Sequence, residues 1–190
     1  MSGTVVDEQQ ALIDAGLAVL RRQGSDGLTV NDVLAEAGLS TRAFYRHFGS
    51  KDALVLAIYA HDTERARAQM QKRLSDAPSP RAALDIWIDE TLALGFDGRR
   101  ASRTRPLARE GMRLQAEFPE EFADIRGAVL DPLVDVLRAL DSPDPVRDAR
   151  SIHAVAWEIV AERMRGSQLS RASARAYVLR FCLPALGLKR

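Results

Sequence analysis

The chain has 190 residues, of which 46% are hydrophobic and 28% charged, and its formal net charge is +1. A globular chain of this length buries roughly 70% of its unfolded surface, so no disulfide or metal is needed to stabilise it. Its single cysteine, Cys182, excludes an intramolecular disulfide and a cysteine-based zinc site. No run of about 18 apolar residues can cross a membrane, and no apolar signal-peptide core is present, so we expect a cytoplasmic protein.

Only 6% of the residues are aromatic, whereas Ala, Leu and Arg are abundant. These residues favour helices, and strand-like alternation is hard to find, so we expect an all-α fold. The first helix is predicted over residues 7–23, where apolar side chains form one broad stripe. Gly24 follows as a stop. Residues 1–6 are expected to form a short mobile arm.

Residues 29–51 contain three helix starts and two helix stops. Thr29 can cap a helix that begins at Val30, with Asp32 in the position of a capping-box acid. Apolar residues at i, i+3, i+4 and i+7 form the inward face of this helix. Gly38 then supplies the left-handed residue that ends it.

A second short helix follows almost at once. It begins at Ser40 or Thr41 and buries Phe44 and Phe48, which are spaced i, i+4. Gly49 is expected to close it before the next helix starts. The pattern predicts a helix, a tight turn and a second helix.

The outward face of this second helix is polar, basic and aromatic. It is formed by Thr41, Arg42, Tyr45, Arg46 and His47. No acidic residue occurs between residues 40 and 51, although residues 1–60 as a whole hold five basic and seven acidic side chains. A local basic face of this kind suits a groove lined with phosphates. The alternative interpretation is a solvated face of an amphipathic helix.

Further helices are predicted over residues 51–74, 80–96, 119–140, 145–165 and 170–186. Two prolines make residues 75–80 the best candidate linker. Between residues 96 and 119 an arginine-rich segment is followed by Pro106, which we expect either to interrupt a helix or to start a short one.

The last two predicted helices carry apolar residues on more than one face, so each needs a partner on both sides. In a chain this short, a second copy of the same helix pair is the simplest additional partner. We therefore predict a homodimer with an isologous four-helix interface.

The helix-turn-helix segment resembles the TetR family of transcriptional regulators. The resemblance covers roughly the first third of the chain, and the matching positions are Thr29, Val33, Leu34, Ala35, Ala37, Gly38, Leu39, Ser40, Phe44, Tyr45, Phe48, Ser50, Lys51, Asp52 and Leu54. Two positions depart from the family pattern. Arg42 stands where Gly is frequent, and Ala43 stands where a hydroxyl residue is frequent, so operator preference is not expected to transfer simply.

This resemblance implies a homodimeric repressor that binds a palindromic operator in double-stranded DNA and is released by an unknown small-molecule effector. Residues 1–55 would form the DNA-binding domain, and residues 56–190 the helical effector-binding and dimerisation domain. Thr41 and Arg42 are the candidates for base contacts. The candidates for backbone contacts are Thr29, Ser40, Tyr45, His47 and Lys51, with Arg46 intermediate.

The resemblance also implies an effector cavity in the second domain. The residues that could line it are Trp87, Thr91, Phe96, Met112, Phe118, Phe122, His153 and Trp157. Each of these residue types is more often simple core. The arginines of residues 99–113 could assist an anionic effector, and a solvated surface is the alternative.

Enzyme chemistry is not expected, because no phosphate-binding glycine loop and no nucleophile elbow is present. The three histidines are far apart and lack partners at zinc spacing, so we expect no metal and no cofactor. Two other functions remain open. One is a helical protein–protein adaptor that uses the basic face of residues 40–51 for an acidic partner, and the other is a monomeric architectural DNA-binding protein.

Overall fold

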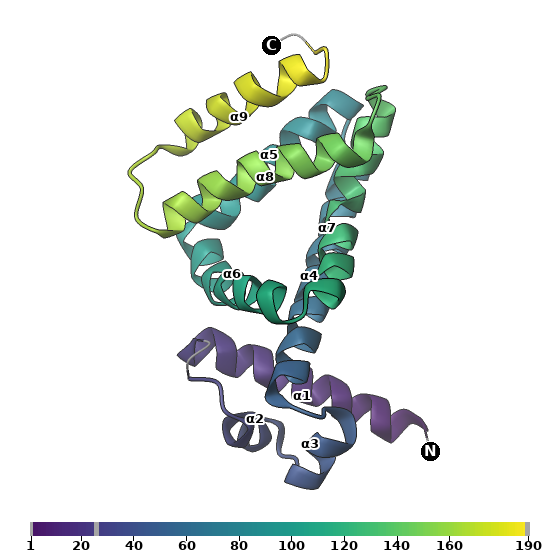
Figure 1. The fold of residues 1–190 in the computed structure, drawn as a ribbon, viewed down its shortest axis with the longest axis vertical. Helices are drawn as coiled ribbons and strands as arrows, with labels where there is room; N and C mark the ends of the chain where they lie inside the picture. Colours follow the sequence, from purple (N-terminus) through teal and green to yellow (C-terminus); the bar gives the residue numbers. More distant parts are fainter. Residues whose placement is uncertain (1, 25–26, 189–190) are drawn as a thin grey trace. The chain divides into compact units, whose positions relative to one another are not determined.

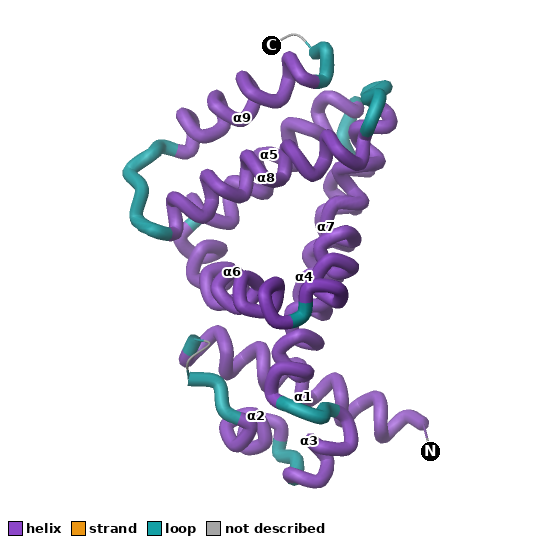
Figure 2. Tube along the Cα trace, in the orientation of Figure 1, coloured by secondary structure: helices purple, strands orange, loops and turns teal. Residues whose placement is uncertain are grey.

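The computed structural model describes residues 2–24 and 27–188. Within these residues every regular element is a helix, which confirms the all-α prediction (Figures 1 and 2). The helices are α1 (Ser2–Gln23), α2 (Val30–Ala37), α3 (Thr41–His47), α4 (Lys51–Ser75), α5 (Pro80–Phe96), α6 (Gly98–Glu117), α7 (Pro119–Ala139), α8 (Pro145–Met164) and α9 (Arg171–Ala185). None of these described helices combines the length and apolar character that spanning a membrane requires.

The chain forms two compact units. Met1–Glu64 and Arg105–Ile125 make up the first, while Arg65–Thr104 and Arg126–Arg190 make up the second. Helices α4, α6 and α7 therefore contribute residues to both units. The division of function after residue 55 stays a prediction.

The core of the first unit fixes α1 against the helix-turn-helix. Phe44 of α3 is completely buried together with Leu12 and Leu20 of α1 and Ile58 of α4. Gly16 allows α1 and α4 to approach closely, since a Cβ added there would lie 2.5 Å from Cδ1 of Ile58. The position of α3 is thus determined by apolar contacts with both α1 and α4.

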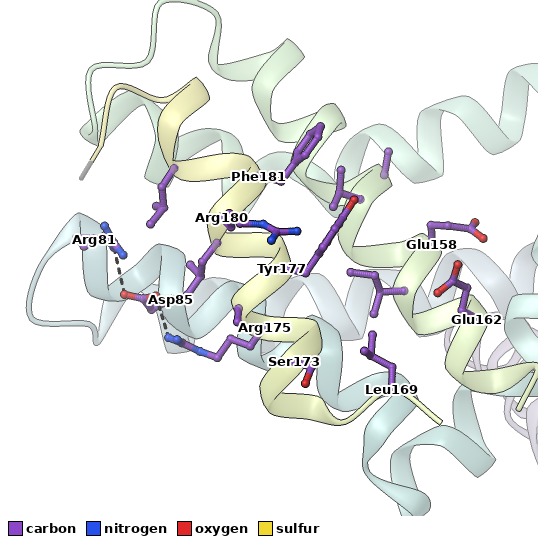
Figure 3. A pocket seen from close by; sticks show the side chains of 16 residues that line it. Arg81, Asp85, Glu158, Glu162, Leu169, Ser173, Arg175, Tyr177, Arg180 and Phe181 are labelled. Atoms are coloured by element: carbon purple, nitrogen blue, oxygen red, sulfur yellow. Dashed lines mark hydrogen bonds and ion pairs between the residues drawn. The ribbon is translucent and has the colours of Figure 1, made fainter. Parts of the chain in front are cut away.

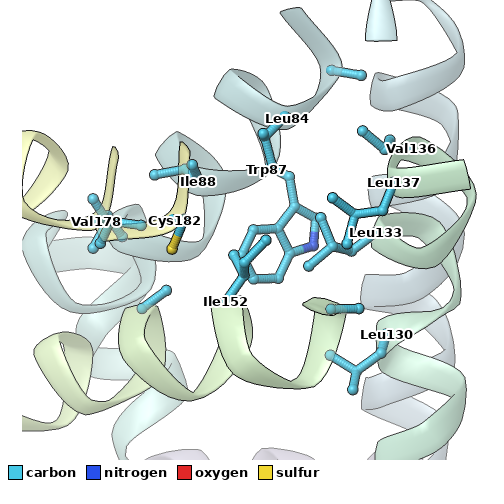
Figure 4. Packing of buried hydrophobic residues seen from close by; sticks show 14 of the residues in the cluster. Leu84, Trp87, Ile88, Leu130, Leu133, Val136, Leu137, Ile152, Val178 and Cys182 are labelled. Carbon is cyan, nitrogen blue, oxygen red and sulfur yellow. The ribbon is translucent and has the colours of Figure 1, made fainter. Parts of the chain in front are cut away.

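The core of the second unit is formed around α5. Figure 4 shows the buried Trp87 between Leu133 and Leu137 of α7 and Ile152 of α8. Gly95 lets α5 pass close to α8, because a Cβ at this position would lie 3.1 Å from a backbone oxygen of α8. The apolar faces predicted for α5, α7, α8 and α9 therefore meet in one core.

Two boundary predictions outside α2 and α3 are wrong. Helix α1 begins at Ser2 rather than at residue 7, and no proline in residues 2–6 stands in the way of a helical backbone. Helix α6 runs without interruption through Pro106. An interior proline costs roughly 3 kcal/mol, whereas burying Leu107 and Leu114 stabilises the helix by about 3–6 kcal/mol in total.

Candidate nucleic-acid interface

Helix α2 has the cap and the stop that its sequence predicts. The hydroxyl of Thr29 accepts a hydrogen bond from the backbone N–H of Asp32 (3.1 Å) and donates one to the carboxylate of Asp32 (2.6 Å). Gly38 ends the helix with φ 65°, in the left-handed region where glycine avoids the Cβ clash. The backbone N–H of Leu39 then bonds to the carbonyl of Leu34 (3.1 Å), which completes a tight turn.

Helix α3 begins at Thr41, three residues after Gly38. Ser40 caps it by accepting a hydrogen bond from the backbone N–H of Ala43 (3.2 Å), and Phe44 and Phe48 are buried as predicted. The expected stop at Gly49 is wrong. Phe48 itself leaves the helix in an extended conformation (φ −131°), because its ring is drawn into the core of the first unit.

The outer face of α3 is open to solvent. Thr41 and Arg42 are exposed, and Tyr45 is 61% exposed with its ring edge against Phe44 (5.2 Å between centroids). Within the described part of the chain, Arg42 has no hydrogen-bond or ion-pair partner. A guanidinium, a hydroxyl and a phenol on one short helix can donate to phosphates or to base edges.

The other end of α3 is bound to α1. One oxygen of Glu8, Oε2, accepts hydrogen bonds from Nη2 of Arg46 and from Nε2 of His47 (3.0 Å). These bonds hold the pKa of the Glu8 carboxyl below its usual value, with the His47 bond as the main cause and Arg46 next. The side chain of His47 is only 5% exposed, so the structure places it in a bridge to α1 and not on the outer face.

Glu8 was not identified from the sequence as a functional residue. It lies 38 residues before Arg46 and 39 before His47, and nothing in a local pattern connects such distant positions. The only available signal is its place on the polar side of the first predicted helix, which many solvated acids share.

Helix α4 starts beside the turn. Ser50 caps it by accepting from the backbone N–H of Ala53 (3.0 Å), and the ammonium of Lys51 lies 3.4 Å from the carbonyl oxygen of Leu28. Lys51 remains exposed. With Thr29, Ser40, Thr41, Arg42, Tyr45 and Arg46, it completes the solvent-accessible members of the predicted DNA-binding set.

The residues predicted to line an effector cavity are divided between the two units. In the second unit, the ring of His153 is stacked on Trp157 (5.9 Å between centroids) and lies 6.2 Å from that of Trp87. Burial lowers the pKa of His153 to about 4, and the nearby charge of Arg126 adds to the effect. Thr91 is buried in the same unit.

The other predicted cavity residues have separate surroundings. Phe96 lies under the guanidinium of Arg163 (5.6 Å) in the second unit. In the first unit, Phe122 is buried against Tyr59 (5.1 Å between centroids), and Phe118 is partly buried. Met112 is 71% exposed and encloses no cavity here. The effector cavity therefore stays a prediction, which Trp87, His153 and Trp157 support best.

A groove of about 1420 Å³ lies along α8 and α9 (Figure 3). The side chains of Tyr177 and Phe181 are stacked in it (6.4 Å between centroids) and are exposed. Arg175 fixes α9 to α5 through bonds to Asp85 (2.9 Å) and Asp89 (3.0 Å). In the single chain, Tyr177 and Phe181 of α9 therefore remain exposed, whereas most apolar residues of α8 are buried or partly buried.

The sequence predicts no metal site, and the structure can be searched for groups of side chains that could bind one. Among the residues with described positions, no three His, Cys, Asp or Glu side chains are grouped so that they could hold a metal ion. The thiol of Cys182 is buried, and this burial raises its pKa to about 11. We therefore assign no chemistry to it.

Known proteins resemble this chain in sequence and in fold. Residues 12–58 match the family described as "Bacterial regulatory proteins, tetR family". The HTH-type transcriptional regulator CymR of Pseudomonas putida is 32% identical over 120 residues, which cover 59% of each chain. The HTH-type transcriptional repressor KstR of Mycolicibacterium smegmatis is 23% identical over 88% of this chain and 80% of its own.

The matches with CymR and with YvdT of Bacillus subtilis span about half of the length of those relatives. Solved structures extend the likeness of fold to the whole chain. A TetR-family regulator from Pectobacterium atrosepticum superposes with a TM-score of 0.77 at 16% identity and full coverage of both chains. The regulator FadR of Bacillus subtilis, solved with stearoyl-CoA, has a TM-score of 0.65 at 13% identity, with 93% of this chain and 98% of FadR covered.

Proposed function

Because this chain belongs to the TetR family of transcriptional regulators, we propose that it is a homodimeric repressor of a palindromic operator, released by a small-molecule effector. The observation that carries the proposal is the outer face of α3. Thr41, Arg42 and Tyr45 project from it without partners among the described residues that would compete with DNA, while the buried Phe44 fixes the helix from behind.

The dimensions of α3 suit the major groove. Its seven residues span about 10 Å at 1.5 Å per residue, and a helix fits the groove width of about 12 Å. Thr41 and Arg42 lie in its first turn, where recognition helices contact base edges. Thr29, Ser40, Tyr45 and Lys51 are also exposed, and we assign them to the phosphates.

Two copies are needed to read a palindrome. The groove on α8 and α9 supports an isologous interface because it exposes Tyr177 and Phe181 beside charges of both signs. Glu158 and Glu162 of α8 can face Arg180 of α9 in a second copy. The dimer would then place its two α3 helices about 34 Å apart, one turn of the duplex.

The effector is assigned to the second unit. Trp87, His153 and Trp157 bring two indole rings and a largely buried imidazole close together, and aromatic side chains of this kind commonly line ligand sites. The stearoyl-CoA in the FadR structure is a property of FadR, and it supports only the general proposal that this fold accommodates an effector.

An electrophoretic shift of the chain's own upstream DNA, repeated at two salt concentrations, tests the function. We expect a discrete complex that persists at the higher salt concentration, while complexes with unrelated DNA are lost. Equal loss of both complexes would contradict sequence-specific binding. A protein–protein adaptor that binds an acidic protein through residues 40–51 would show no preference between the upstream DNA and unrelated DNA.

A further inference from the structure

The two arginines of α3 are in different electrostatic states. Arg42 has no partner among the described residues, whereas Arg46 is paired with Glu8 of α1. The Arg46 side chain is still 49% exposed, so burial alone would not keep it from a phosphate. The difference lies in the Glu8 carboxylate, which cancels one of the two positive charges on the helix that we assign to the DNA groove.

Glu8 is held in place independently of Arg46. The nearly buried His47 donates to the same oxygen, Oε2, at 3.0 Å. Departure of Arg46 toward DNA would therefore leave a fixed carboxylate beside the end of α3, on the helix assigned to the DNA groove, without its arginine partner. Like charges placed together across an interface are strongly unfavourable, so the pair is favoured also when DNA is bound.

Resting on the proposed function, we infer that Glu8 withholds Arg46 from the DNA backbone and thereby limits binding to non-operator DNA. Contacts to phosphates carry no sequence information and supply nearly all non-specific affinity. Removing one such contact lowers the affinity for all sequences, and it leaves discrimination to the base-reading residues Thr41 and Arg42. Glu8 thus sets the sequence-independent part of the DNA affinity, and it does so through Arg46 without itself touching DNA.

The test compares wild type with Glu8→Gln and with the double variant Glu8→Gln, Arg46→Gln. Fluorescence anisotropy would measure the binding of a random-sequence duplex between 50 and 200 mM KCl. Glutamine keeps an acceptor for His47 but loses the charge. For Glu8→Gln we expect the slope of log K against log salt to steepen by about 0.9, and affinity at about 0.1 M salt to rise about eightfold.

The double variant removes both charges, so it should return to the slope of the wild type. The slopes of the double variant and the wild type can still be compared if Glu8→Gln alone fails to fold. Asp62→Asn is the matched control, because it likewise removes a carboxylate and frees an arginine, Arg21, from an ion pair (2.8 Å). Asp62 lies about 16 Å along α4 from Lys51, away from the predicted DNA contacts. This control should leave the slope unchanged.

Two results would overturn the inference while leaving the proposed function intact. One is an unchanged slope for Glu8→Gln in a wild-type protein that binds DNA. The other is a double variant whose slope is shallower than that of the wild type by about 0.9, since Arg46 would then be leaving Glu8 for a phosphate. Failure of the wild type to bind any duplex would instead overturn the proposed function, and this inference with it.

Discussion

Arg42→Ala removes the one cation of α3 that has no partner among the described residues. The substitution breaks no ion pair and opens no cavity, so the unfolding free energy should change by less than about 0.5 kcal/mol. A good bidentate contact of an arginine to a base contributes about 1–3 kcal/mol of discrimination. We therefore expect operator affinity to fall by about 5- to 150-fold while the melting temperature is unchanged.

The assay is an anisotropy titration of an operator fragment selected from genomic DNA, repeated with a scrambled duplex of the same length. Circular dichroism melts would verify the unchanged stability. Arg150→Ala is a suitable control, because Arg150 is also an exposed arginine, on α8, and the change in net charge is the same. Equal losses of affinity for operator and scrambled DNA on Arg42→Ala would refute a role in base recognition.

Three other substitutions test separate parts of the account. Lys51→Ala should lower the affinity for operator and for scrambled DNA alike, and it should flatten the slope of log K against log salt by about one unit, since its ammonium neutralises phosphate charge. A loss of affinity confined to the operator would contradict this. Phe181→Asp should convert the dimer to monomer in sedimentation velocity, whereas Val146→Asp, at an exposed apolar position outside the groove, should remain dimeric. A dimeric Phe181→Asp would exclude this interface. His153 has a folded pKa of about 4, below its ordinary 6.5, so its contribution to stability is complete above pH 6.5 and is lost as pH falls toward 4. Denaturant unfolding should show up to about 3 kcal/mol of this loss, absent in His153→Gln, and parallel pH profiles for both proteins would refute it.

The helix-turn-helix could be predicted from sequence because its signals are local. The cap at Thr29, the left-handed Gly38 and the cap at Ser40 each act within three or four residues of their own position. The spacing of Phe44 and Phe48 then identifies the buried face, and with it the exposed one. Local hydrogen bonding and helical periodicity were sufficient here.

Tertiary contacts decided the parts that the sequence did not predict. Pro106 indicated a break in α6, but the burial of Leu107 and Leu114 outweighs the local cost of a proline. His47 was assigned to the DNA backbone, yet Glu8, 39 residues away, draws its side chain toward α1. No periodicity relates residues so far apart in the chain.

The residues that line an effector cavity are hard to predict from sequence for a different reason. Residue type does not distinguish a cavity wall from an ordinary core, and Met112, included for its apolar side chain, is exposed. Trp87 and His153 lie 66 residues apart in sequence, and only the packing of α5 against α8 brings their rings to 6.2 Å.

A hydroxyl-radical footprint of the wild-type protein on its selected operator is the most direct test of the central claim. We expect two protected half-sites related by a two-fold axis, with centres about 34 Å apart and one dimer bound per operator. A single protected half-site, or protection no stronger than on scrambled DNA, would contradict a dimer that reads DNA through paired α3 helices.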